Sequence, residues 1–194
     1  MKRKRKVRYP SFVDIKSIKS RGRLNYRFWL RIPFKNRTDS KILCVILKNP
    51  SVASNSQCDN TISRVCNVAN CNGYDEVIIL NLFPFRSTRA KGVVKFYNNK
   101  YFKNIMKVNL QIIKSMCKNR DVVFAWGTNT ISQSKKNIAI YDNTIKYVTS
   151  NVISRTNYVK RCICSKKKCN NKHPYIRYPL HGLRWNNNSR IIKY

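Results

Sequence analysis

Acidic residues are scarce in this sequence, and this excludes the usual explanation of many charged residues, which is a solvated surface of mixed charge. Only seven Asp and Glu accompany 41 Lys and Arg in 194 residues, which gives a net charge of +34. A solvated face of mixed charges is excluded because too few carboxylates remain to balance the field. A chain this basic repels itself unless a polyanion is nearby, so we expect nucleic acid as the partner, bound through its phosphates.

Long apolar runs are also missing. No segment is long and apolar enough to span a bilayer, and the basic residues 1–10 lack the apolar stretch of a signal peptide. We therefore expect a cytoplasmic protein that does not bind membranes, with its eight cysteines as free thiols. An anionic membrane surface is the weaker alternative partner, because no basic amphipathic helix is found.

Internal repeats and linkers are absent as well, which favours one domain over residues 1–194. We interpret the first ten residues as a flexible basic arm that binds phosphates. We expect the protein to be a monomer.

Short apolar runs alternate with helical patterns along the chain. Runs at 42–47, 76–83 and 121–127 are rich in β-branched and apolar residues, as central strands of parallel sheets are. A helical face follows Asp59, which is a good N-cap, and residues 101–117 also have helical spacing. This order predicts an α/β fold with a parallel sheet. Further strands are expected at 26–32, at a sheet edge, and at 158–164.

Polar residues follow each of the three apolar runs. They are Asn49-Pro50-Ser51 after the first, Asn81 in the second and Trp126-Gly127 at the end of the third. Ligands bind at the carboxyl ends of the strands in such sheets. We therefore expect these residues to converge on one site.

Five short motifs, in this order, resemble the uracil-DNA glycosylase superfamily. They are Asn49-Pro50-Ser51, Asp59 with Thr61, Asn81-Leu82-Phe83, Trp126-Gly127 and His173-Pro174. The pattern is closer still to a widespread bacterial and phage family long catalogued only as a domain of unknown function. The resemblance covers roughly residues 24–180, and five motifs in order are more specific than any one alone. It implies a three-layer α/β/α fold around a central, mostly parallel, four-stranded sheet.

The chain departs from the superfamily pattern at three positions. Lys48 and Ser51 stand where the first motif has glycine, and Tyr175 follows His-Pro where the last motif has serine. These departures bear on efficiency and base choice more than on the fold.

The resemblance implies an enzyme that flips uracil out of DNA and hydrolyses its N-glycosidic bond, with no cofactor. Asn49 would position the water, and His173 would donate a hydrogen bond to the leaving base. His181 is the alternative to His173, because the chain has only two histidines. Structural alternatives remain: Asn49 as an Asx-turn, Asn81 as a strand cap, and Asp59 as an N-cap rather than a second water-positioning group.

The remaining site residues follow from the same resemblance. Substrate contacts are expected from Asn81, Pro50, Ser51 and Phe83. DNA contacts are expected from Arg86, Arg89, Lys91 and Tyr175, and the residue that fills the gap left by the flipped base is Tyr175, Ile176 or Leu180. The expected partners are uracil-containing DNA, single- or double-stranded, and protein inhibitors of these glycosylases.

A cysteine-rich stretch offers a metal site as an alternative. Cys162, Cys164, Cys169 and His173 are spaced almost as zinc ligands are. The Cys-x-Cys spacing is tighter than usual, and a ligated histidine would not serve catalysis. We therefore favour no metal.

Two rival functions remain. One is a non-catalytic nucleic-acid-binding protein on the same fold, and the other is an enzyme for another modified base or for free nucleotides. The net charge of +34 is excessive for a free nucleotide.

Overall fold

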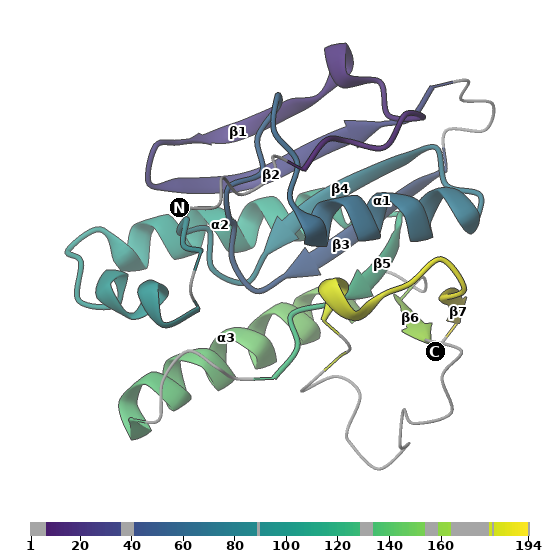
Figure 1. Cartoon of the computed structure of the whole chain (residues 1–194). Helices are drawn as coiled ribbons and strands as arrows, with labels where there is room; N and C mark the ends of the chain where they lie inside the picture. The colour runs from purple at the N-terminus through teal and green to yellow at the C-terminus, as the bar shows by residue number, and fades with distance from the viewer. Residues whose placement is uncertain are drawn as a thin grey trace.

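The chain is described here by a computed structural model, which covers residues 7–35, 41–88, 90–128, 134–153, 159–163, 179 and 181–193. Within these residues the strands form one seven-stranded mixed sheet in the order β1-β2-β4-β3-β5-β6-β7 (Figure 1). The strands are β1 (Lys19–Arg23), β2 (Tyr26–Pro33), β3 (Ile42–Leu47), β4 (Glu76–Asn81), β5 (Asp121–Phe124), β6 (Val159–Ile163) and β7 (Arg190–Lys193). The helices are α1 (Asn60–Cys71), α2 (Phe102–Met116) and α3 (Lys135–Ile153), with 3-10 turns η1 (Ile15–Ser17), η2 (Ala90–Phe96) and η3 (Gly182–Arg184).

The centre of the sheet is parallel and its edges are antiparallel. β3 pairs in parallel with β4 on one side and with β5 on the other, and β6 continues in parallel from β5. β2 and β1 extend one edge as an antiparallel hairpin, and β7 extends the other. The predicted α/β class is confirmed. The sheet has seven strands rather than the four that the resemblance implies. Sequence patterns do not predict β1 because it is wholly exposed and lacks any apolar pattern.

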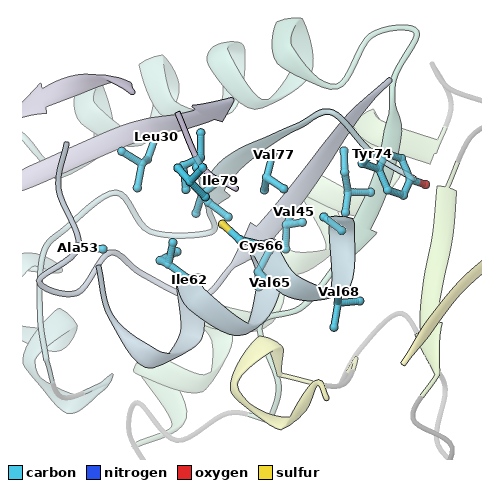
Figure 2. Packing of buried hydrophobic residues seen from close by; sticks show 14 of the residues in the cluster. Leu30, Val45, Ala53, Ile62, Val65, Cys66, Val68, Tyr74, Val77 and Ile79 are labelled. Atoms are coloured by element: carbon cyan, nitrogen blue, oxygen red, sulfur yellow. The ribbon is translucent and has the colours of Figure 1, made fainter. Parts of the chain in front are cut away.

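Helix α1 covers one face of the sheet. The Asp59 carboxylate caps it by accepting a hydrogen bond from the Ile62 amide at 2.9 Å, and Gly73 follows its end with a positive φ of 72°. Its buried side packs on alternate residues of the strands, including Val45 of β3 and Ile79 of β4 (Figure 2).

Helices α2 and α3 cover the opposite face. The intervening strand residues, such as Ile46 and Phe124, belong to the second core cluster together with side chains from both helices. Each central strand is therefore buried on both sides, which explains why its sequence is continuously apolar. In the described part of the chain, no helix is long and apolar enough to cross a membrane.

The connections reverse direction at β3. The chain passes from β3 through α1 to β4, and then through α2 on the other face to β5, which lies on the far side of β3. Such a reversal leaves a crevice at the carboxyl ends of the two strands that diverge, here β3 and β5.

Candidate active site at the carboxyl ends of β3 and β5

A cavity of about 680 Å³ lies at this crevice. Its wall is formed by the end of β3 and the turn after it, the segments after β4 and β5, Arg27 of β2, the start of α1, and the loop around η3. The lining residues are Arg27, Leu47, Lys48, Asn49, Ser51, Asp59, Thr61, Ile62, Ser87, Thr88, Gly127, Thr128, Pro179, His181, Leu183 and Arg184.

Backbone hydrogen bonds hold the strand ends together beneath the cavity. The Leu82 and Phe83 amides donate to the carbonyls of Leu47 and Lys48 at 2.8 and 3.0 Å. The Ala125 amide donates to the Ile46 carbonyl at 2.8 Å. These bonds continue the strand pairing just beyond the regular strands and hold the segments that lead to the site residues.

Asn49 presents a hydrogen-bond acceptor to the cavity. Its Nδ2 donates to the carbonyls of Pro50 and Ser87 at 3.0 and 2.8 Å. Because both partners are carbonyl oxygens, the nitrogen of the amide is identified and Oδ1 is left as an acceptor. The Asn49 side chain therefore links the loop after β3 to the loop after β4 and leaves Oδ1 as an oriented acceptor.

His181 is the histidine that the fold brings to this cavity. Its Nδ1 accepts a hydrogen bond from the Leu183 amide at 3.1 Å, which caps η3. Burial, followed by the nearby charges of Lys48 and Arg184, lowers the pKa of His181 below its ordinary value of 6.5. A neutral ring with an accepting Nδ1 carries its proton on Nε2, so His181 is a neutral donor.

Gly127 makes room for this ring. A Cβ added at Gly127 would lie 2.9 Å from Cβ and 3.3 Å from Cδ2 of His181, and the backbone there has a φ of 71°. Only glycine combines that conformation with such a close approach. The close approach of His181 explains the glycine of the Trp126-Gly127 motif. Trp126 itself is fully buried in the core.

Lys48 places a buried positive charge beside the cavity. In the sequence, this lysine is marked only by its departure from the glycine of the first motif. Its side chain is buried, and Nζ donates to the Thr128 carbonyl at 2.6 Å and lies 6.0 Å from the centre of the Tyr141 ring. Burial lowers the pKa of Lys48 to about 8. The ammonium form therefore predominates at neutral pH.

Asn81 lies behind the cavity rather than in its wall. It is fully buried and is paired in register with Leu47, which does line the cavity. In the described part of the chain, neither Oδ1 nor Nδ2 of Asn81 has a hydrogen-bond partner. A buried amide with both atoms unpaired is unusual and costly, so it calls for a specific explanation.

Phe83, for which a substrate contact is predicted, lies in the core and is not among the residues that line the cavity. Its ring centre lies 5.7 Å from that of Tyr97 and 5.9 Å from that of Tyr141. The chain turns inward after β4, so the ring packs on the face covered by α2 and α3.

The other predicted residues have mixed placements. Ser51 lines the cavity, and Pro50 is buried with its carbonyl accepting from the amides of Asn49 and Ser87. Arg86 is partly buried and donates to the carbonyls of Ser51 and Ala53, so it supports the loop after β3.

Several predicted residues cannot be placed in the site. Lys91 lies in η2 and Cys162 in β6, but only their backbones are described. Outside the described residues lie Arg89, Cys164, Cys169, His173, Tyr175, Ile176 and Leu180. Within the described part, no group of three or more His, Cys, Asp or Glu side chains is placed to hold a metal ion.

Comparison with known proteins gives one match. A family model described as "Protein of unknown function (DUF1643)" matches residues 27–175. No curated protein and no solved structure matches the chain.

Proposed function

We propose that this chain, which belongs to the DUF1643 family of proteins of unknown function, is a DNA glycosylase that removes uracil from DNA. We further propose that its sheet and two helical layers correspond to the three-layer fold of the uracil-DNA glycosylase superfamily. The observation that carries the proposal is the meeting of Asn49 and neutral His181 in one cavity of a strongly basic chain.

The cavity supplies the groups that N-glycosidic hydrolysis needs. In this reaction the base leaves as an anion, the sugar becomes cation-like, and a water must be held beside it. Asn49 Oδ1 would hold the water, and Nε2–H of His181 would donate to a carbonyl oxygen of the leaving base. The ammonium group of Lys48 would favour the negative charge that develops on the base. Asp59, which also lines the cavity, would favour the sugar cation.

Asn81 supports uracil as the base. An amide donor and acceptor match the O4 and N3–H groups of uracil, and both atoms of this amide lack partners in the described part of the chain. Asn81 does not line the cavity, whereas its register partner Leu47 does, so we propose that the Leu47 side chain moves when a base enters.

The experiment that tests the function is direct. The protein is incubated at low salt with an oligonucleotide that contains one uracil, and the strand is then cleaved with alkali at any abasic site. We expect cleavage at the uracil with the parental protein and almost none with Asn49→Ala. Binding without cleavage by the parental protein would instead identify a non-catalytic nucleic-acid-binding protein, and cleavage only at another modified base would correct the substrate.

The pH dependence of the single-turnover rate should be bell-shaped. His181 is positioned by the hydrogen bond that its Nδ1 accepts from the Leu183 amide, and protonation of Nδ1 removes this acceptor, so the rate should fall once the pH drops below the lowered pKa of His181. Lys48 acts as a cation, so the rate should fall as the pH rises through about 8. A rate measurement across this range, with DNA in excess of its dissociation constant, checks both limbs.

The control for the alkaline limb is Lys48→Met, which keeps the length of the side chain without its charge. This variant should be slower throughout and should lose the decline near pH 8. If the decline persists unchanged in Lys48→Met, another group titrates there and the role given to Lys48 is wrong.

A further inference from the structure

A second cavity of about 400 Å³ adjoins the first through Arg27, which lines both. Three of its lining residues are arginines, and none is acidic. The lining residues are Ser20, Gly22, Arg23, Leu24, Arg27, Ser54 and Arg86. We call this cavity the arginine pocket.

Arg27 is a buried charge in this pocket, with Asp59 close enough to favour the charge but not in ion-pair contact with it in the described part of the chain. Its side chain is 1% exposed, and Nη1 donates to the Ala53 carbonyl. In the described part of the chain, Nε has no hydrogen-bond partner and the guanidinium forms no ion pair with a carboxylate. Burial and the neighbouring Arg86 lower its pKa to about 10, so it stays charged at neutral pH. A buried guanidinium with an unpaired N–H donor destabilises the fold unless an anion binds to it.

The β1–β2 hairpin brings Arg23 to the same place. The pairing of β1 with β2 shifts register between Arg21 and Gly22. A Cβ at Gly22 would lie 2.3 Å from the Tyr26 carbonyl oxygen and 2.7 Å from Cα of Arg27, so only glycine allows the strands to meet there. After this irregular pairing, the exposed Arg23 lines the same pocket as the buried Arg27.

We propose that the arginine pocket binds a phosphodiester group of the DNA strand whose flipped nucleotide occupies the main cavity. Guanidinium groups match the geometry of phosphate oxygens and form strong charge-assisted hydrogen bonds with them. Because Arg27 lines both cavities, one side chain contacts the flipped nucleotide and its neighbouring phosphate. The identity of the strand rests on the proposed function, whereas the phosphate chemistry does not.

The test compares Arg23→Gln with Arg21→Gln. Both residues are exposed on β1 and both changes remove one positive charge, but only Arg23 lines the pocket. Single-stranded oligonucleotides are made with one 2′-fluoro-deoxyuridine, whose glycosidic bond resists cleavage. Each also has one neutral methylphosphonate, at a different position in each oligonucleotide. Dissociation constants are measured for the parental protein and both variants.

We expect one methylphosphonate position near the uracil to weaken binding by the parental protein and by Arg21→Gln, about tenfold. Arg23→Gln should bind the unmodified strand more weakly and should have lost this positional sensitivity. Its affinity should also depend less on salt, with a slope reduced by about 0.7 for one lost phosphate contact on a single strand. Equal sensitivity in Arg23→Gln, or no sensitive position in the parental protein, would overturn the proposal.

Two further results separate the possible failures. Inorganic phosphate is added at constant ionic strength, with sulfate-free chloride as the reference. If it abolishes the positional effect at low concentration, the pocket serves a free anion and the proposed strand contact is wrong. If the positional effect is present but no uracil is removed in the alkali assay, the phosphate site stands and the glycosylase proposal fails.

Discussion

His181→Ala should lower the single-turnover rate of uracil excision about a hundredfold or more while binding of uracil-containing DNA changes little. The Nε2–H group would meet negative charge that exists only as the base leaves, so its removal weakens the transition state and spares the ground state. The neutral ring fixed by the Leu183 amide is the basis of this expectation. The rate is measured by quenching the reaction and cleaving abasic sites with alkali.

His181→Asn separates catalysis from the cap. Asparagine is a preferred N-cap residue, so it should still accept from the Leu183 amide and keep η3 in place, but its amide is too short to replace Nε2. We expect this variant to unfold at the parental temperature and to be as slow as His181→Ala. His173→Ala is the comparison for the original assignment. If His173→Ala loses the activity and His181→Ala retains it, the structure-based choice is wrong.

The strands at the centre of the fold were predictable because a strand that is buried on both faces has a continuously apolar sequence. The run at 42–47 coincides with β3, while those at 76–83 and 121–127 extend beyond β4 and β5. The predicted runs are longer than the strands because the residues just after Asn81 and Phe124 still form hydrogen bonds to β3, although they lie outside the regular strands. The outer strands were harder to predict, because β1 is exposed and takes its place only from its pairing with β2.

The site was predictable only where a local signal marked it. Asn49 was found because the following proline fixes the end of the strand. The choice between His173 and His181 followed the neighbouring proline, and nothing in the local sequence shows that the positive φ of Gly127 leaves space for His181. Arg27 and Lys48 sit in or beside apolar strands, where a charged residue is expected to face solvent. Both are buried, and their charged groups donate to the carbonyls of the loop residues Ala53 and Thr128.

Asn81→Leu should stabilise the protein and, at the same time, lower the rate of uracil excision at least tenfold. Leucine has a similar size, and it would remove a buried amide whose two atoms are unpaired in the described part of the chain. Such an unpaired group costs about 1–3 kcal/mol. A gain of about 1 kcal/mol in unfolding free energy would raise the melting temperature by about 2–4 °C in a protein of this size. The loss of the amide should leave the polar edge of uracil without a partner, so excision should fall at least tenfold.

Asn109→Leu is the matched control, because Asn109 is the same residue type, equally buried, and lies on α2. Its Oδ1 is also unpaired in the described part of the chain, but its Nδ2 donates to the carbonyls of Asn81 and Leu82 at 3.0 and 3.2 Å, so the same substitution should lower the melting temperature. Opposite changes in stability, with excision lost in a stabilised Asn81→Leu, would identify Asn81 as an amide kept for its ligand. If Asn81→Leu instead destabilises the fold as Asn109→Leu does, or removes uracil at the parental rate, then Asn81 is only a strand cap. The glycosylase proposal would then lose the residue that distinguishes uracil from other bases.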